Sequence, residues 1–399
     1  MSKRYPSGFI STFYNPLKNP NAPTIGTATG GDVSASVAFT APDDVGGSAI
    51  TEYYARSTPG DVTATAASSP INVTGLTNGT AYTFAVWAIN TYGPSAYSAV
   101  SNSASPFSPR ALYYGGYNTA GIMQDTIDYV TIATTGNSAN FGSLIAATRL
   151  NAATGSSSRG LQARGLAADR NVIEYVTYSS TGNSQDFGDL TVARYGLSAC
   201  NNATRSIFGA GDSGASSNVI DFVTTATTGN ATDFGDLTQG TSNGAACSSP
   251  TRGVFAHGFA GGGSNTISYI TTATAGNATD FGDLLSDIYN IGGCSSSTRG
   301  IFMGNHISSN VIAFITIATT GNATDFGDCS FGGPGKVAAS SETRGLIFGG
   351  CSGSNVPTDS QNIIEYVTIA STGDATDFGD LSARKMQGSA SSGANGGLQ

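Results

Sequence analysis

Two aspartates around a Phe-Gly pair are the residues of this chain whose type and spacing could most simply do chemistry. Asp233 and Asp236 lie in the decapeptide TTGNATDFGD at 227–236, and the same ten letters return at 319–328. Calcium prefers several oxygen ligands, so repeated carboxylate pairs could hold this ion. Two carboxylates are too few without added carbonyl oxygens, and Asp beside Gly also caps turns. Calcium therefore stays open, and the sequence predicts no other cofactor.

Other residue types that carry catalysis are scarce and scattered. His257 and His306 are the only histidines and occupy different repeat positions, so they assemble no metal set and no catalytic triad. Asp-Phe-Gly occurs five times, but the His-Arg-Asp loop and strand lysine of a protein kinase are missing. We therefore expect no enzymatic activity. A histidine acting as a base is the alternative that these residues leave open.

Composition narrows the functional classes further. Only 11% of the 399 residues are charged, 54 are glycine, and the net charge is −9. A nucleic-acid surface needs clustered cations to displace counterions, and lysine is nearly absent after residue 18. The sequence contains no run of 18 apolar residues and its start has no apolar signal-peptide core. We expect neither nucleic-acid binding nor membrane insertion.

Six versions of the decapeptide give the chain a period. Their glycines are 46, 47, 47, 45 and 52 residues apart, at Gly136, Gly182, Gly229, Gly276, Gly321 and Gly373. Each unit reads as four strands: a small-residue strand, an Arg-led strand, an alternating strand, and the end of the decapeptide. A period of 45–50 residues built from strands predicts a β-propeller. SASSGAN near the C-terminus matches a first strand, so it should complete the first of six blades and close the ring.

The repeats resemble kelch repeats. Gly349 and Gly350 match that family's Gly-Gly after the second strand, Tyr366 matches its third-strand Tyr, and Phe378 takes the place of its fourth-strand Trp. The resemblance implies a kelch-like propeller, with the decapeptide Phe packed against the neighbouring blade.

Two further positions recur in the units. An arginine opens each second strand, at Arg110, Arg159, Arg205, Arg252, Arg299 and Arg344. These arginines could pack against acidic residues of neighbouring blades. They could instead form a circle of cations that binds an anionic glycan. Their presence in every unit favours the packing role. Cys200, Cys247 and Cys294 are spaced by 47 residues, which predicts small buried residues rather than disulfides.

Residues 22–105 show short alternating segments between Gly, Pro and Asn turns, as in a β-sandwich. INVTGLTNGTAYTFAVWAINTYGPSAYS resembles the second half of a fibronectin type III domain. Leu76 and Tyr82 match its Leu and its corner Tyr, whose hydroxyl bonds nearby backbone. Phe39 should fill the core position of the family's missing Trp. The predicted fold is all-β: an extended arm at 1–21, this sandwich at 22–105, and a six-bladed kelch-like β-propeller at 106–399 closed by the C-terminal strand.

As a whole, the chain resembles virion structural proteins of tailed bacteriophages, marine ones in particular. The opening RYPSGFIS, the Gly/Thr/Ala-rich sandwich and repeats such as IDYVTIATTGN carry this resemblance. It implies a non-enzymatic virion protein that is assembled in the host bacterial cytoplasm. The arm would dock on other virion proteins through its anchors Tyr5, Pro6, Phe9, Ile10, Phe13 and Tyr14.

The propeller would then be displayed outward and bind a host-surface glycan or protein, as a tail- or fibre-associated component. Its ligand face should lie where the repeats disagree, in the loops around His257, His306 and Asp359. One alternative is a capsid decoration or cement protein. The other is a glycan-active enzyme, which would need two acids about 5–10 Å apart, drawn from the irregular insertion around Asp359.

Overall fold

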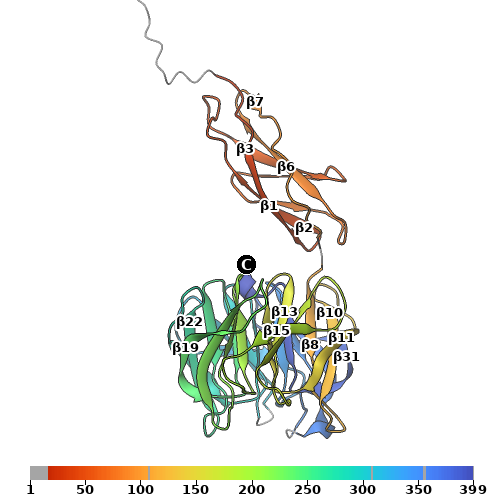
Figure 1. Cartoon of the computed structure of the whole chain (residues 1–399), viewed down its shortest axis with the longest axis vertical. Coiled ribbons are helices and arrows are strands. Elements are labelled where there is room, and N and C mark those ends of the chain that lie inside the picture. The colour runs from red at the N-terminus through yellow and green to blue at the C-terminus, as the bar shows by residue number, and fades with distance from the viewer. Residues whose placement is uncertain (1–16, 107, 307–308, 354–355, 399) are drawn as a thin grey trace, which may run out of the picture. The chain divides into compact units, whose positions relative to one another are not determined.

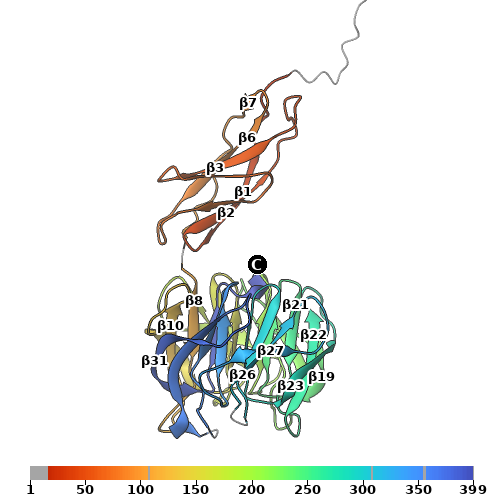
Figure 2. The same ribbon diagram turned by 180° about the vertical axis from the view of Figure 1, so that it is seen from behind.

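The chain folds into two compact units that divide between Ser108 and Pro109, three residues beyond the predicted boundary. The computed structural model describes residues 17–106, 108–306, 309–353 and 356–398. Throughout these ranges the regular elements are β-strands and two short 3-10 turns, so the fold is all-β, as predicted. Figures 1 and 2 show the strands from opposite sides. Within the described ranges, no helix has the length and apolar character that a membrane crossing requires.

The predicted arm anchors are Tyr5, Pro6, Phe9, Ile10, Phe13 and Tyr14. All six lie outside the described residues, so their docking role stays a prediction.

The first unit consists of two antiparallel sheets around one core. The first sheet has the order β1-β2-β5 and the second has the order β4-β3-β6-β7. Every second side chain of β2 and β6 is buried, which places one face of each strand in the core. The strands are β1 (Thr24–Gly31), β2 (Ser34–Thr40), β3 (Glu52–Thr58), β4 (Thr63–Ala66), β5 (Ile71–Thr74), β6 (Thr83–Asn90) and β7 (Gly93–Pro94).

The residues singled out in this unit lie as the sequence predicts. The Tyr82 hydroxyl accepts a hydrogen bond from the backbone N–H of Thr77 at 3.0 Å. Leu76 and Phe39 are buried in the same core. Trp87 lies on β6, where it stacks on Tyr54 with ring centroids 5.0 Å apart.

The second unit contains six antiparallel sheets of four strands, one of which gains a short fifth strand. We number the sheets along the chain. The first sheet is β8 (Arg110–Tyr114), β10 (Gln124–Thr131), β11 (Ala139–Thr148) and β32 (Ser389–Ser392); the second is β12 (Ala152–Gly155), β13 (Arg159–Ala163), β14 (Val172–Thr177) and β15 (Gln185–Asp189); the third is β16 (Ser198–Asn201), β17 (Arg205–Gly209), β18 (Ser217–Thr224) and β19 (Thr232–Thr241). The fourth is β20 (Ala245–Ser248), β21 (Arg252–Ala256), β22 (Ser264–Thr271) and β23 (Thr279–Ile288); the fifth is β24 (Gly292–Ser295), β25 (Arg299–Met303), β26 (Val311–Thr316) and β27 (Thr324–Asp328); the sixth is β28 (Val337–Ser340), β29 (Arg344–Phe348), β30 (Gln361–Thr368) and β31 (Thr376–Met386), with β9 (Tyr117–Asn118) at its edge.

The inner strands of the six sheets contact one another in a closed cycle. β12, β16, β20, β24, β28 and β32 each contact the next, and β32 also contacts β12. As predicted, the C-terminal strand β32 pairs with β8, with Ser391 opposite Leu112, and completes the first sheet. The first and last parts of this unit are therefore held side by side by backbone hydrogen bonds.

The decapeptide of each sheet binds the decapeptide of the next. In the fourth sheet, Gly276 donates its N–H to the carbonyl of Phe234 in the third sheet at 2.7 Å. Asn277 accepts, through Oδ1, the N–H of Asp236 at 3.0 Å. Equivalent amide-to-backbone bonds occur at all six sheet boundaries, with Asp374 in the place of Asn at one of them. The ten residues repeat because each copy must fit both neighbours.

Aromatic and arginine side chains complete each boundary. Phe234 is buried in a cluster with Ile270 of the next sheet, which confirms the predicted packing of the decapeptide Phe. Arg252 lies 4.5 Å above the Tyr269 ring and donates to the carbonyls of Ile317 and Ala318 in the next sheet. The six arginines repeat this arrangement around the cycle. They bond carbonyl oxygens rather than the acidic residues considered from the sequence.

The five cysteines are buried thiols, as predicted for the three that repeat. The regular spacing of the three repeating cysteines follows from their packing against a glycine in the next sheet. A Cβ added to Gly253 would lie 2.6 Å from the sulfur of Cys200, and one added to Gly345 would lie 3.0 Å from that of Cys294. Each of the three repeating thiols, Cys200, Cys247 and Cys294, thus fills the space that the next sheet's glycine leaves.

Candidate ligand site at the mouth of the central cavity

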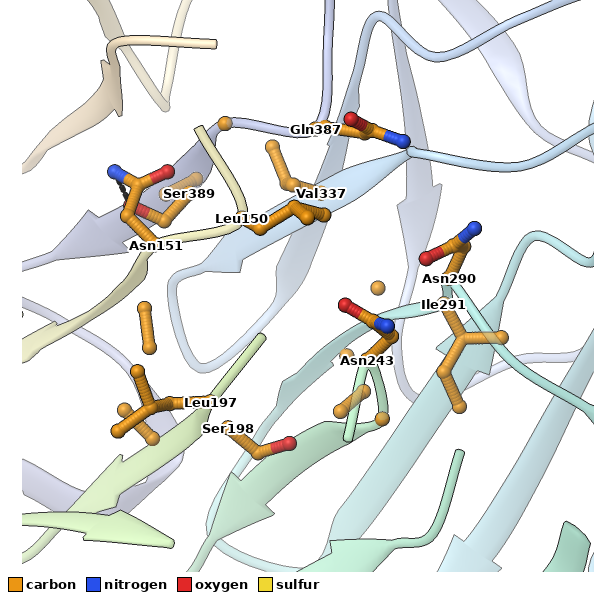
Figure 3. Close-up of a pocket in the computed structure, with 18 of the residues that line it drawn as sticks. Leu150, Asn151, Leu197, Ser198, Asn243, Asn290, Ile291, Val337, Gln387 and Ser389 are labelled. Atoms are coloured by element: carbon orange, nitrogen blue, oxygen red, sulfur yellow. Dashed lines mark hydrogen bonds between the residues drawn. The ribbon is translucent and has the colours of Figure 1, made fainter. Parts of the chain in front are cut away.

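The inner strands surround a cavity of about 100 Å³ (Figure 3). It lies at the end of the channel that holds the first residues of the inner strands. In the antiparallel sheets, the last residues of the second strands lie at this same end. Apolar and carboxamide side chains share its lining: Leu150, Leu197, Ile291, Val337, Asn151, Asn243, Asn290 and Gln387. The site therefore combines apolar walls with neutral hydrogen-bonding groups.

A cyclic chain of backbone hydrogen bonds shapes this mouth. Two positions before the first residue of each inner strand, the backbone has a positive φ: Leu150 (53°), Gly196 (67°), Asn243 (55°), Asn290 (58°), Gly335 (74°) and Gln387 (55°). Each donates its N–H to the carbonyl of its counterpart in the preceding sheet, with N···O distances from 2.7 to 3.1 Å, and the sixth bond closes the cycle. The left-handed backbone is costly for non-glycine residues, so neighbouring sheets must hold it in place. We call these six residues the mouth ring.

The chain's last described residues cross the opposite end of the channel. The 3-10 turn η2 (Gly396–Leu398) contacts β16, β20 and β24. It packs so closely that a Cβ on Gly396 would lie 2.0 Å from the carbonyl oxygen of Ser296. The cavity lies at the other end of the inner strands, inside the mouth ring.

No carboxylate is among the described residues that line this cavity. Its lining residues include no Asp, Glu, His or Cys. Lys336 lines it, but its side chain is buried and its Nζ lies 2.9 Å from the centroid of the Phe331 ring. Burial lowers the pKa of Lys336 to about 8. The pair of acids required for glycosidic cleavage is missing from this lining, whereas neutral groups suited to binding are present.

Two amide oxygens at the cavity have no hydrogen-bond partner among the described residues. Asn151 donates through Nδ2 to Ser389 Oγ at 2.8 Å, which leaves its Oδ1 without a donor. Asn243 Oδ1 also lacks a donor, and it lies over Gly196, where an added Cβ would approach it to 2.5 Å. Both oxygens are buried from solvent rather than open to the cavity, so each is an unmet hydrogen-bond acceptor inside the structure, which is costly.

Aromatic side chains stand beside the mouth ring. Tyr289, which precedes Asn290, stacks on His306 with ring centroids 3.9 Å apart, and Phe259 packs edge-on against Tyr289 at 5.7 Å. The residue before each mouth-ring position differs from sheet to sheet: Arg149, Tyr195, Ser242, Tyr289, Pro334 and Met386. The residues at the boundaries between sheets are repeated from sheet to sheet, whereas the residues beside the mouth ring differ.

The three residues predicted for a ligand face lie in equivalent loops of successive sheets but do not converge. His257, in the fourth sheet, is fully buried and bonds Ser268 Oγ through Nε2 at 2.8 Å, so it is a core residue and does not reach a ligand. His306, in the fifth sheet, is partly exposed at the rim. Asp359 ends the 3-10 turn η1 (Pro357–Asp359) in the sixth sheet, and its carbonyl accepts the N–H of Ser352.

His257 gives the second unit a defined acid sensitivity. Burial lowers the pKa of His257 from 6.5 to about 4, so between these values the unfolded chain binds a proton that the folded chain excludes. Stability is expected to fall by about 3 kcal/mol as the pH drops through this window. Denaturant unfolding of wild type, His257→Gln and His306→Gln across pH 4–7 checks it. His257→Gln should flatten the slope of the unfolding free energy against pH, and His306→Gln should change that slope less. Parallel pH curves for the three proteins would contradict the assignment of the acid sensitivity to His257.

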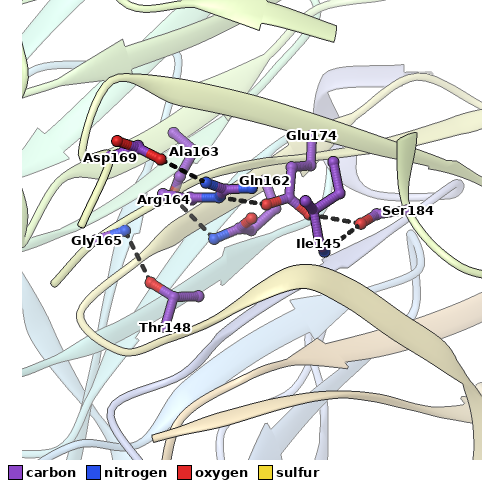
Figure 4. A network of polar contacts seen from close by, with 9 residues as sticks. All are labelled: Ile145, Thr148, Gln162, Ala163, Arg164, Gly165, Asp169, Glu174 and Ser184. Atoms are coloured by element: carbon purple, nitrogen blue, oxygen red, sulfur yellow. Dashed lines mark hydrogen bonds and ion pairs between the residues drawn. The ribbon is translucent and has the colours of Figure 1, made fainter. Parts of the chain in front are cut away.

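Buried acids on the third strands form a feature that the sequence reading missed. Glu174 on β14 bonds Arg164 Nε at 2.5 Å, Ser184 Oγ, and the N–H of Ile145 in the preceding sheet (Figure 4). Asp128 pairs with Lys385 at 2.7 Å and Asp221 with Arg194 at 3.0 Å. The signal was an acid inside an apolar strand, as in IDYV and IEYV. These paired acids join neighbouring sheets.

The calcium hypothesis gains no ligand cluster from the structure. Asp233 and Asp236 both lie on the outer strand β19. Among residues 17–106, 108–306, 309–353 and 356–398, no group of three or more His, Cys, Asp and Glu side chains could hold a metal ion.

Comparison with known proteins bears on the fold. No protein-family model matches the chain, and no curated protein matches it. Its structure is similar to that of the bacterial protein YjhT, a kelch-type β-propeller, with a TM-score of 0.51 and 8% sequence identity. The match covers 62% of this chain and 88% of YjhT. At this identity the likeness shows a β-propeller fold and nothing about activity.

Proposed function

We propose that the chain is a non-enzymatic bacteriophage virion protein whose second unit is a six-bladed, kelch-like β-propeller that binds the host surface. The six sheets and their cyclic inner-strand contacts support the blade count. The strand order of the two sheets in the first unit, together with the Tyr82 bond, supports a fibronectin type III-like sandwich.

One observation carries the binding role. The residues that repeat around the propeller are used in contacts between blades, as in the turn-to-strand bonds of Asn277 and the carbonyl bonds of Arg252. The residues that differ lie around the mouth ring, beside the cavity that apolar and carboxamide side chains line. Such a division suits a rigid ring that presents one variable face to a ligand. It gives the repeated arginines a structural role rather than an anionic-glycan site.

A host-binding tail or fibre component accounts for this face better than capsid decoration does. A cement protein needs broad contact with its capsid neighbours, whereas the mouth is a concave site with few polar groups, as ligand sites are. The glycan-active alternative is disfavoured because none of the described residues that line the cavity carries a carboxylate. Calcium is not needed by any part of this proposal.

Removing residues 1–21 is expected to abolish incorporation into virions and leave the propeller folded. The proposed anchors, including Phe9 and Phe13, lie in this segment, whereas the described propeller contacts lie within residues 109–398. Complementing a phage that lacks the gene, followed by mass spectrometry of purified particles, measures incorporation. Thermal unfolding of the truncated chain is the control. Normal amounts of truncated protein on virions would overturn the anchoring role.

A further inference from the structure

The exposed apolar side chains of the second unit gather at one of its ends. Among its described residues, seven large apolar side chains are exposed: Ile122, Ile145, Val192, Phe259, Leu285, Val311 and Val356. All seven lie in the loops at the mouth-ring end or on the strand segments next to these loops, and none of the described ones lies at the opposite end. Single exposed apolar residues are ordinary on a protein surface. A one-sided distribution indicates an interaction face.

A small pocket brings two of these side chains together. Leu285 on β23 and Val311 at the start of β26 line a pocket of about 30 Å³, with the buried Phe302 as part of its wall. The lining therefore comes from both the fourth and the fifth sheets. One buried water needs about 10–15 Å³ of such space, so the pocket holds the tip of one side chain and has no room for a sugar ring. It suits an apolar side chain that projects from a larger partner.

An aromatic group continues the apolar surface beside this pocket. Ile288 and Asn305 line the pocket, and the residues that follow them, Tyr289 and His306, stack with ring centroids 3.9 Å apart. The exposed Phe259 packs edge-on against Tyr289 at 5.7 Å. Aromatic side chains are enriched at the centres of protein interfaces, where they contribute most of the binding energy. We call Phe259, Leu285, Tyr289, His306 and Val311 the apolar patch.

The charges beside the apolar patch are negative. Asp287 lies on β23, and Asp328 stands opposite the first residue of β26; both are exposed, and neither forms an ion pair within the described part of the chain. Between Gly253 and Gly335 the sequence has one Lys or Arg, namely Arg299, which opens β25 at the opposite end. Lys336, the next cation, is buried. The patch thus combines an apolar centre with uncompensated acids.

This combination selects among the classes of partner. An anionic membrane surface or an acidic glycan would be repelled by the acids beside the patch. A second copy docked through the same patch would place like charges opposite each other. A protein surface that presents an apolar side chain between Lys or Arg residues complements both the pocket and the charge.

We infer that the apolar patch docks a basic protein surface on the host cell. One apolar side chain of the partner enters the pocket between Leu285 and Val311, and its Lys or Arg side chains lie beside Asp287 and Asp328. This assignment rests on the proposed host-binding function and names the partner of that function as a protein.

Leu285→Ser tests the pocket with little risk to the fold, because Ser330 and Ser382 occupy the equivalent position in the fifth and sixth sheets. Labelled full-length variant is expected to bind host bacteria about tenfold more weakly than wild type, as for the loss of an interface hot spot. Ile145→Ser is the matched control: it changes the equivalent residue of the first sheet, which is also exposed but lies outside the patch. Unchanged binding by Leu285→Ser, or an equal loss in both variants, would contradict the site.

The charge of the partner is tested on a pair of aspartates from one strand. Asp287→Asn should weaken cell binding about threefold, whereas Asp280→Asn, an exposed acid at the other end of β23, should leave it unchanged. Raising the salt from about 0.05 M to 0.5 M should weaken wild-type binding, because exposed charges are screened, and should weaken Asp287→Asn less. Wild-type binding that salt leaves unchanged, or equal effects of the two substitutions, would overturn the inference.

Proteolysis of the cell surface separates this inference from the function on which it rests. Labelled wild-type protein is added to host bacteria before and after their surface proteins are digested. Binding that is lost on digestion supports both proposals. Binding that survives digestion keeps the host-binding function and overturns the protein partner. Absence of binding to undigested cells overturns the host-binding function, and this inference with it.

Discussion

Ending the chain after Gly388 is expected to abolish cooperative folding of residues 109–399. The deletion removes β32, which pairs along β8 and contacts the inner strands on both sides. It also removes Ser391, whose hydroxyl bonds those of Tyr114 at 3.0 Å and Tyr178 at 2.6 Å in the buried core. Two buried hydroxyls without partners cost about 1–3 kcal/mol each, and the lost strand adds to this. The sum approaches the whole stability of an ordinary domain, about 5–15 kcal/mol.

A second truncation isolates the strand from the segment that follows it. A chain that ends after Ser392 keeps β32 and loses the η2 turn, so it should remain folded with a modest loss of stability. Thermal unfolding by circular dichroism and binding of a hydrophobic dye compare the two. If the chain ending at Gly388 melted within a few degrees of the full chain, closure by β32 would not hold the ring.

Gly235→Ala is expected to destabilise the second unit by about 3 kcal/mol or more, since strained backbone and overpacking each cost about 1–3 kcal/mol. Gly235 has φ of 143°, and an added Cβ would lie 2.6 Å from the carbonyl carbon and oxygen of Gly276. These atoms are backbone and cannot rotate away. The substitution therefore forces apart the contact between two decapeptides.

Its matched control is the other glycine of the same contact. A Cβ on Gly276 meets nothing within 4 Å, so Gly276→Ala should change stability by less than about 1 kcal/mol. Urea unfolding of both variants gives the comparison. If the two variants were equally destabilised, the decapeptide would tolerate alanine poorly at either glycine. The close contact between neighbouring decapeptides would then not explain the effect of Gly235→Ala.

The sequence predicted those parts of the fold that a local pattern determines. Strand alternation and the repeat period located the four strands of each sheet, and the unmatched Arg110 strand required the C-terminal strand as its partner. The burial of Phe234 and the Tyr82 bond followed from motifs in the same way. Each of these depends on residues whose spacing along the chain is fixed by a strand or a turn.

The site could not be predicted because it depends on contacts between repeats. The mouth ring places Leu150 and Gln387 in left-handed backbone, which their residue types disfavour and which neighbouring sheets impose. His257 differed from its counterparts and suggested a ligand face, yet a buried bond to Ser268 explains the difference. The acids Asp128 and Glu174 were overlooked since their partners lie in other segments of the chain.

The central claim, a virion protein that presents a ligand-binding propeller, is tested most directly by a cryo-EM map of the intact particle. We expect density for this chain on the tail or its fibres, with residues 1–21 against another virion protein and the mouth ring facing solvent. Absence of the chain from the particle, or a mouth ring packed against the capsid, would contradict it.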